Sequence, residues 1–197
     1  MNSGPAGCKS SSPTTNMAAQ TANPVLILTG PPGSGKTTVA RLLAGRYERA
    51  AHIEADRFFR FIESGYIEPW KSESHEQNTT VMRIVARAAA GYGHDGYFTI
   101  VDGIVAPRWF LLPLREWLAS EGLPVAYVVL RASLETCVER AAGRVASGLA
   151  SQAVIEQLYR EFDDLGELER HVVQADKASP EQVVDRIASA LAEMVLR

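Results

Sequence analysis

The feature that most constrains the fold of this chain is a short apolar run that leads directly into a glycine-rich turn. Val25–Thr29 reads V-L-I-L-T, and residues 30–37 read G-P-P-G-S-G-K-T, a complete match to the pattern G-x-x-x-x-G-K-T. The residues that follow, Thr37–Arg46, carry apolar side chains at helical spacing. A buried strand, a tight turn and an amphipathic helix in this order predict a loop whose backbone wraps around a phosphate group.

Each part of this loop has an expected task. Its glycines allow backbone N–H groups to turn inward around a phosphate without a Cβ in the way. Lys36 would reach the β- and γ-phosphates, and the hydroxyl of Thr37 would coordinate Mg²⁺. The sequence therefore predicts a site for ATP with Mg²⁺. The residues expected to contact the nucleotide are Gly30, Pro31, Pro32, Gly33, Ser34, Gly35, Lys36, Thr37 and Thr38.

Other residues decide which class of phosphate-binding protein fits. Proteins that read guanine use an N-K-x-D sequence, and the chain contains none. A motor ATPase places two adjacent acids after its third strand, whereas Asp102 is followed by Gly103, so the acid that activates water is missing. The sequence therefore favours transfer of a phosphoryl group to an acceptor over GTP binding or motor activity.

Apolar runs alternate with helical patterns along the rest of the chain. The expected strands are Val25–Thr29, Ala51–Glu54, Tyr97–Val101, Val125–Leu130 and His171–Gln174. The expected helices are Thr37–Arg46, Asp56–Glu63, His75–Ala90, Pro107–Ser120, Leu134–Ala142, Ser151–Phe162 and Ser179–Leu196. This alternation predicts an α/β fold of three layers, a parallel sheet with helices on both faces.

The first residues differ in composition from the rest. Met1–Asn23 consists mainly of small and polar residues, so it buries too little apolar surface to offset the entropy of ordering. We expect a disordered N-terminal extension over residues 1–23, in which Met17 could be the true start. One working domain is expected over residues 24–197.

The composition argues against several further classes of protein. The net charge is −3 and 46% of the residues are hydrophobic, without the run of about 18 apolar residues that a membrane span needs. The mild acidity argues against a protein that coats duplex nucleic acid. Cys8 and Cys137 form neither a metal-binding pattern nor a disulfide framework, so we expect a cytoplasmic protein. Nothing in the sequence predicts the oligomeric state.

Three carboxylates mark the ends of the second and third expected strands. Glu54 and Asp56 end the second strand, with Asp56 20 residues beyond Lys36, and Asp102 ends the third. Ligands bind at the carboxyl ends of parallel strands, so we expect Asp56 to orient an acceptor hydroxyl and take its proton. Alternatively, Asp56 only caps the following helix. Glu54 and Asp102 could support Mg²⁺, and Asp102 could also contact the acceptor, or the two could have only local roles at a strand end and an Asp-Gly turn.

Arginines supply positive charge after the fourth expected strand. Arg140 and Arg144 lie four residues apart at a helix end, and a break that contains Gly and Ser follows. We expect a lid near residues 140–151 that closes over ATP, with these arginines stabilising the transferring phosphate. A solvated pair of arginines is the alternative. An acceptor that carries its own phosphate would need Arg57 or Arg108 to hold it.

The acceptor site is expected around the loop between the second and third expected helices. Tyr66 and Trp70 in this loop are candidates for its wall. His75, Gln77 and Asn78 could contact a polar acceptor or only cap the next helix. The residues expected to contact the acceptor are Asp56, Arg57, Tyr66, Trp70, Asp102 and Arg108.

These motifs together resemble the small P-loop kinase group. That group includes polynucleotide 5′-kinases, chloramphenicol phosphotransferase, gluconate and shikimate kinases, zeta-toxin-like proteins and nucleoside monophosphate kinases. The run H-I-E-A-D-R-F-F-R-F-I-E-S-G-Y-I-E-P-W, with G-Y-F-T-I-V-D-G-I-V and Y-V-V-L-R, more closely resembles a bacterial family of uncharacterised AAA-type ATP-binding proteins described as kinases. The resemblance extends over essentially all of residues 24–197.

The resemblance implies a P-loop NTPase fold with strand order 2-3-1-4-5. It implies that Asp56 is the general base and that Arg140 and Arg144 are lid arginines. The E-x-D of Glu54 and Asp56 is similar to the D-x-D of shikimate kinases, with Glu in place of the first Asp. Arg108 lies six residues after Asp102, whereas the adenylate-kinase pattern D-G-F-P-R has four, which gives less support to a nucleoside monophosphate as acceptor.

Three functions fit these observations. The first is a kinase that moves the γ-phosphate of ATP to a hydroxyl of a small molecule, with Asp56, Lys36, Arg140 and Arg144 as its catalytic residues. The second is a nucleotide kinase whose acceptor carries a phosphate. The third is an ATP-binding regulator that changes partners without transferring phosphate. The sequence does not name the acceptor.

Overall fold

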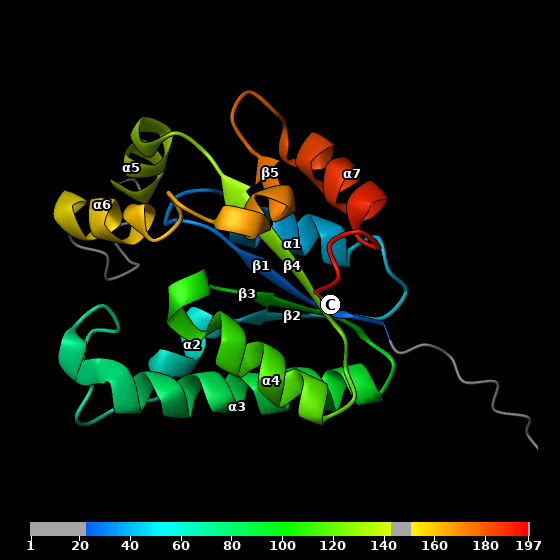
Figure 1. Ribbon diagram of the computed structural model, residues 1–197, viewed down its shortest axis with the longest axis horizontal. Helices are drawn as coiled ribbons and strands as arrows, with labels where there is room; N and C mark the ends of the chain where they lie inside the picture. The colour runs from blue at the N-terminus through cyan, green and yellow to red at the C-terminus, as the bar shows by residue number, and fades with distance from the viewer. Residues whose placement is uncertain (1–22, 143–150, 197) are drawn as a thin grey trace, which may run out of the picture.

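The computed structural model describes residues 23–142 and 151–196 and contains a five-stranded sheet between two layers of helices (Figure 1). The order across the sheet is β2-β3-β1-β4-β5, and each pair of neighbours is parallel. This confirms the expected α/β fold and the strand order implied by the resemblance. The strands are β1 (Val25–Thr29), β2 (Ala50–Glu54), β3 (Phe98–Asp102), β4 (Val125–Arg131) and β5 (Val172–Gln174).

Helices connect the strands and cover both faces of the sheet (Figure 1). The helices are α1 (Lys36–Ala44), α2 (Ala55–Phe59), α3 (His75–His94), α4 (Leu112–Ser120), α5 (Leu134–Ala142), α6 (Gln152–Arg160) and α7 (Pro180–Ala190). The described residues also contain the shorter helical turns η1 (Ser72–Ser74), η2 (Pro107–Leu111) and η4 (Gly166–His171). In the described parts of the chain, no helix is both long enough and apolar enough to cross a membrane.

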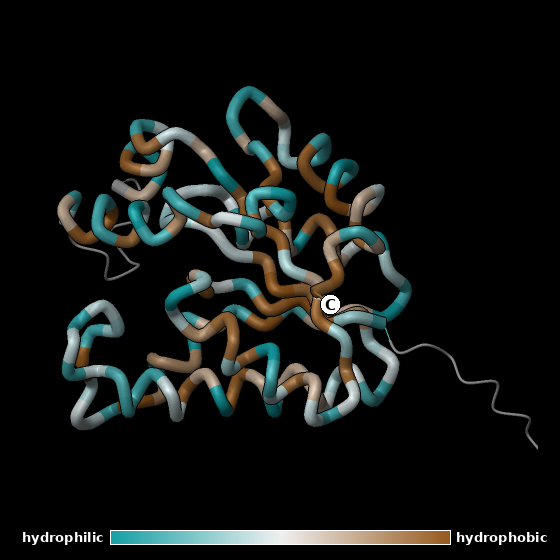
Figure 2. The backbone as a smooth tube through the Cα atoms, viewed as in Figure 1, coloured by the Kyte–Doolittle hydropathy of each residue, from teal (hydrophilic) through white to brown (hydrophobic). Residues whose placement is uncertain are grey.

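Alternate residues of β1 point to two separate hydrophobic clusters. Val25 and Ile27 pack into the cluster formed with α3 and α4, while Leu26 and Leu28 pack into the cluster formed with α1 and α7. Figure 2 shows the hydrophobic residues concentrated along the central strands between the helical layers. Because both faces of the sheet are covered, the central strand β1 is buried along its whole length, as the run V-L-I-L-T predicts.

The expected helix Pro107–Ser120 is broken. Trp109 (φ −135°, ψ 103°) and Phe110 (φ 60°, ψ −1°) are not helical, and a new helix, α4, begins at Leu112. Pro113 explains the break, since it lacks the N–H that a continuous helix would use at this position and it favours a first helical turn. The kink places the Phe110 side chain in the core, where it is 7% exposed.

Three other boundaries differ from those expected by four residues or more. Helix α2 ends at Phe59 and α7 ends at Ala190, which makes both shorter than the sequence predicts, and α3 continues to His94. After α7 the chain turns back, and Val195 forms an antiparallel bridge with Ala126 at the start of β4. Residues 1–22 of the expected extension and residues 143–150 of the expected lid lie outside the described residues.

Candidate active site

The loop after β1 has a backbone that only glycine adopts easily. Gly30, Gly33 and Gly35 have φ values of 139°, 82° and 98°, which favour glycine. A Cβ on Gly30 would collide with the carbonyl oxygen of Leu130, and one on Gly33 with the carbonyl oxygen of Cys137. The glycines therefore allow the loop to pack against the end of β4 and the start of α5. The N-terminus of α1 follows immediately, so its free N–H groups point toward the loop.

The side chains in this loop suit a phosphate group. The Lys36 Nζ donates hydrogen bonds to the carbonyl oxygens of Gly30 at 2.9 Å and Pro31 at 3.0 Å, which holds the ammonium across the loop. The Ser34 hydroxyl is buried and has no hydrogen-bond partner within the described residues. A fixed cation and a buried hydroxyl without a partner are the groups that a phosphate oxygen would engage.

Arg140 reaches the same loop from α5. A Cβ built on Gly35 would lie 4.0 Å from its Nη1 atom, so the guanidinium lies beside the N-terminus of α1. Its side chain is exposed to solvent. Arg144 and the residues after it lie outside the described residues, so the expected lid and the role of Arg144 stay predictions.

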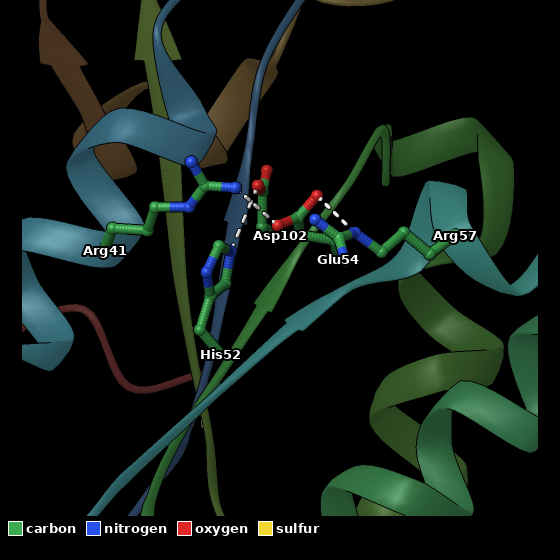
Figure 3. Close-up of polar contacts among 5 residues, drawn as sticks. All are labelled: Arg41, His52, Glu54, Arg57 and Asp102. Atoms are coloured by element: carbon green, nitrogen blue, oxygen red, sulfur yellow. Dashed lines mark hydrogen bonds and ion pairs between the residues drawn. The ribbon is translucent and has the colours of Figure 1, made fainter. Parts of the chain in front are cut away.

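Two sets of polar contacts lie at the ends of β2 and β3 (Figure 3). The Asp102 side chain is 4% exposed, and its Oδ2 lies 3.2 Å from Nε2 of His52. The Glu54 carboxylate bridges Arg41 at 2.8 Å and Arg57 at 2.9 Å. Burial raises the pKa of Glu54, but hydrogen bonds from the two arginines outweigh burial and leave the pKa below its usual value. Glu54 is therefore an ionised group with both oxygens engaged, which leaves its expected role toward Mg²⁺ a prediction.

Asp56 stands at the junction between the phosphate loop and the acceptor side. Helix α2 begins at Ala55 with Glu54 at its N-cap position, so Asp56 lies one residue inside the helix and does not cap it. Protein atoms surround the carboxyl closely, while the side chain remains accessible to solvent through a neighbouring cavity. Asp56 is therefore not the N-cap of α2, in contrast to the alternative considered from the sequence.

The surroundings of Asp56 favour its binding a proton. Burial and the negative charge of Asp102 raise the pKa of the Asp56 carboxyl, whereas the positive charge of Lys36 lowers it. Burial has the largest effect, so the pKa lies above its usual value. The influence of Lys36 and Asp102 shows that Asp56 lies near both the phosphate loop and the end of β3. A carboxylate with a raised pKa is a better proton acceptor than an ordinary aspartate.

A cavity of about 680 Å³ opens beside Asp56. Its wall combines residues from α2, from the loop before α3, from the segment after β3 and from α6. The aromatic residues in the wall are Phe59, Tyr66, Trp70, His75 and Trp109, and the basic ones are Arg60, Lys71 and Arg108. The volume suits a small molecule, and apolar walls with a few polar groups are typical of small-molecule sites.

The structure places the expected acceptor residues in two groups. Tyr66, Trp70 and Arg108 line the cavity together with Asp56. Arg57 instead pairs with Glu54, and Asp102 pairs with His52 and is not part of the cavity wall.

Two polar residues at the start of α3, Gln77 and Asn78, form hydrogen bonds with the loop that precedes the helix. Gln77 donates to the carbonyl oxygen of Ile67 at 2.6 Å and accepts from its N–H at 2.8 Å. Asn78 donates to the carbonyl oxygen of Pro69 at 2.8 Å. These residues therefore hold the loop that carries Tyr66 and Trp70, and Asn78 also lines the cavity.

Sequence reasoning missed several residues of the cavity wall, among them Arg60 and Trp109. Arg60 lies four residues after Asp56 and so projects from the same helical face, a spacing that was available in the sequence. Trp109 lines the cavity because the backbone is kinked at Trp109 and Phe110. Pro113 is a local signal for the break, but nothing in the sequence shows that Trp109 would face the cavity.

The residues present can accommodate Mg²⁺ beside a nucleotide. Thr37 follows Lys36 in the first turn of α1. Asp102 is buried at the end of the neighbouring strand β3 and is in register with Leu28 of β1. No cluster of three or more His, Cys, Asp or Glu side chains able to hold a metal occurs in the described parts of the chain. Mg²⁺ needs none here, since it usually binds through one or two protein ligands plus phosphate and water oxygens.

Comparison with known proteins places this site in a family. A family model described as an AAA domain matches residues 25–165, a range that includes the phosphate loop, the carboxylates and the wall of the cavity. The chain belongs to this AAA-domain family. No curated protein matches the sequence.

Solved structures with similar folds include P-loop kinases. The tunicamycin resistance protein of Deinococcus radiodurans is 20% identical, with a TM-score of 0.65 over 89% of this chain and 99% of that chain. The shikimate kinase of Acinetobacter baumannii, in complex with shikimate, is 20% identical, with a TM-score of 0.62 over 88% and 95%. A gluconokinase of Sinorhizobium meliloti is 18% identical, with a TM-score of 0.63 over 87% and 93%. At these identities the likeness shows that the AAA-domain protein has the fold of the small P-loop kinase group.

Proposed function

We propose that this AAA-domain protein is an ATP-dependent phosphotransferase that moves the γ-phosphate of ATP to a hydroxyl group of a small molecule. The observation that carries the proposal is the position of Asp56. It lines the acceptor cavity and at the same time interacts electrostatically with Lys36 of the phosphate loop. A carboxylate between a phosphate loop and a small-molecule cavity is in the right place to act on an acceptor hydroxyl.

The proposed reaction is an in-line transfer. Asp56 accepts the proton of the acceptor hydroxyl as its oxygen attacks the γ-phosphorus. The bond between that phosphorus and the bridging oxygen of the β-phosphate breaks, so the products are ADP and the phosphate ester of the acceptor, with the proton on Asp56. The raised pKa of Asp56 favours this protonation.

The phosphate loop supplies electrostatic stabilisation. The loop N–H groups and Lys36 bind the β- and γ-phosphates, and Arg140 beside Gly35 adds a second cation near the loop. Thr37 and Asp102 would hold Mg²⁺, with Glu54 as a further candidate. When bound, Mg²⁺ neutralises phosphate charge and orients the oxygens for transfer.

The comparison of Asp56→Asn with the wild type tests this proposal. The variant should bind MgATP as tightly as the wild type, because Asp56 does not belong to the phosphate loop, while its rate of γ-phosphate transfer should fall by about 100-fold or more. Asp95→Asn is a matched control, since Asp95 is an exposed residue at the end of α3. Transfer rates that are equal in Asp56→Asn and the wild type on every accepted substrate would contradict the assignment.

A further inference from the structure

The cavity beside Asp56 is lined by two guanidinium groups, those of Arg60, which follows α2, and Arg108 of η2. Neither forms a hydrogen bond or ion pair with any described residue. Lys71, the third cation of the wall, differs because it pairs with Glu68 at 2.7 Å. Two guanidinium groups from separate segments of one cavity wall, both without a hydrogen bond to the described residues, form a site that suits an anion.

Arg60 lies near the reacting end of the cavity. Burial raises the pKa of Asp56 and the pKa of Tyr66, and the positive charge of Arg60 acts against this rise at both groups. Arg60 is therefore close to both side chains. An anionic group held by Arg60 would lie within a short distance of the hydroxyl that Asp56 activates.

The aromatic part of the wall is held firmly in place. The ring of Phe110 is 5.2 Å from that of Trp109, at an angle of 82°, and 6.0 Å from that of His75, at 24°. Phe110 itself is buried, and its left-handed backbone conformation sets the direction of this segment. Braced aromatic side chains offer flat surfaces at a low entropic cost, and such surfaces bind flat rings by stacking.

The two carboxylates of the wall limit where an anion can bind. In the proposed reaction, Asp56 accepts the proton of the acceptor hydroxyl. Glu161, which follows α6, adds a second negative charge to the wall. The wall therefore carries charges of both signs and is not uniformly basic. Because carboxylates repel an anion and guanidinium groups attract it, an anionic group should bind at Arg60 and Arg108.

From this arrangement we infer that the acceptor is a molecule with a flat ring, a hydroxyl group and an anionic group, held between the aromatic wall and the guanidinium groups of Arg60 and Arg108. The inference rests on the proposed phosphotransferase function and specifies its substrate class. The anionic group is a phosphate monoester or a carboxylate, since a guanidinium binds both through the same paired hydrogen bonds.

Calorimetric titration of matched pairs of compounds tests the inference. The full chain is saturated with Mg²⁺ and a non-hydrolysable ATP analogue, so that the probes cannot occupy the nucleotide site. Thymidine 5′-monophosphate is compared with thymidine, and 3-(hydroxymethyl)benzoate with benzyl alcohol, which separates phosphate from carboxylate recognition. Glycerol 3-phosphate provides an anion without a ring. In at least one pair the anionic compound should bind about tenfold to a hundredfold more tightly than its neutral partner and more tightly than glycerol 3-phosphate.

Variants assign the preference to the two arginines. Arg60→Gln and Arg108→Gln should each remove most of the anion preference, while Arg83→Gln, an exposed arginine of α3 outside the cavity, should retain it. Arg60 and Arg108 are exposed as well, so these substitutions should not prevent folding. Neutral compounds that bind as tightly as their anionic partners, or a preference that survives in both variants, would overturn the inference.

The same proteins separate this inference from the proposed function. Anion-dependent binding of ring compounds without any γ-phosphate transfer would support the assigned ligand class and contradict phosphotransfer. Transfer to neutral acceptors at equal rates in the wild type, Arg60→Gln and Arg108→Gln would support phosphotransfer and contradict the ligand class.

Discussion

At the scale of single residues, the glycines of the phosphate loop occupy positions where a side chain would strain the backbone or collide with it. Gly33 has φ 82°, and a Cβ there would meet the backbone of Cys137. Gly33→Ala should therefore lower the free energy of unfolding by about 2 kcal/mol or more and weaken MgATP binding. Denaturant unfolding and nucleotide titration measure the two effects.

Gly91 provides the matched control for this substitution. It lies within α3, and nothing would approach a Cβ there within 4 Å. Gly91→Ala should be more stable than the wild type by about 0.5–1 kcal/mol, because alanine favours a helix over glycine. If Gly33→Ala were as stable as Gly91→Ala, the loop would not need the backbone conformation described above.

The raised pKa of Asp56 has a consequence for stability at different pH values. A carboxyl that binds its proton more tightly when folded than when unfolded favours folding at low pH and disfavours it as the pH rises through the interval between the two pKa values. Asp56→Asn should therefore be more stable than the wild type at neutral pH. This advantage should disappear as the pH falls below about 3.9, the usual pKa of aspartate.

Urea unfolding of both proteins at a series of pH values measures this difference. Titrating groups far from Asp56 contribute equally to the two proteins, so the difference reports Asp56 together with the charged groups near it. A wild type that is more stable than Asp56→Asn at neutral pH would show that the carboxylate is stabilised, not destabilised, by its surroundings.

At the scale of elements, the loop between α2 and α3 is positioned by side chains and not by regular structure. Gln77 binds both the N–H and the carbonyl oxygen of Ile67, and Ser74 donates to the carbonyl oxygen of Pro69 at 2.9 Å. These bonds hold Tyr66 and Trp70 against the cavity. Sequence reasoning had left open whether Gln77 contacts an acceptor or caps the helix, because a side-chain bond to a loop depends on how the loop folds.

Gln77→Ala should loosen this loop without unfolding the sheet. The Ile67 amide should exchange its hydrogen at least about tenfold faster, as expected when a hydrogen bond of about 1.4 kcal/mol is lost. Hydrogen exchange measures the effect, and Gln152→Ala, which removes an exposed side-chain bond on α6, is the control. Equal protection of Ile67 in Gln77→Ala and the wild type would mean that Gln77 does not hold the loop.

Elements with strong local signals could be predicted from the sequence, and those set by packing could not. The ends of the strands were predicted to within one residue, because most of the strands are short apolar runs bounded by polar residues. The break between η2 and α4 had a local signal in Pro113, but the direction of Trp109 depends on the burial of Phe110. The early end of α2 at Phe59 likewise depends on the loop that follows it.

At the scale of the whole molecule, the sheet brings residues from distant segments to one edge. The phosphate loop follows β1, Asp56 follows β2, Asp102 ends β3 and Arg140 comes after β4. Each of these could be found in the sequence because parallel strands end at the same edge. The cavity could not be found in this way, since its wall joins four segments whose distances depend on tertiary packing.

The central claim is that this edge of the sheet transfers a phosphoryl group, and the fate of the γ-phosphate tests it most directly. ATP labelled in the γ-phosphate is incubated with the full chain, Mg²⁺ and a panel of sugars, nucleosides, nucleotides and hydroxylated aromatic acids. The label should appear in an organic phosphate ester with at least one acceptor, and Asp56→Asn should abolish this product. Label that appears only as inorganic phosphate, or that stays in ATP with every acceptor while MgATP is bound, would contradict the claim and point to an ATP-binding regulator.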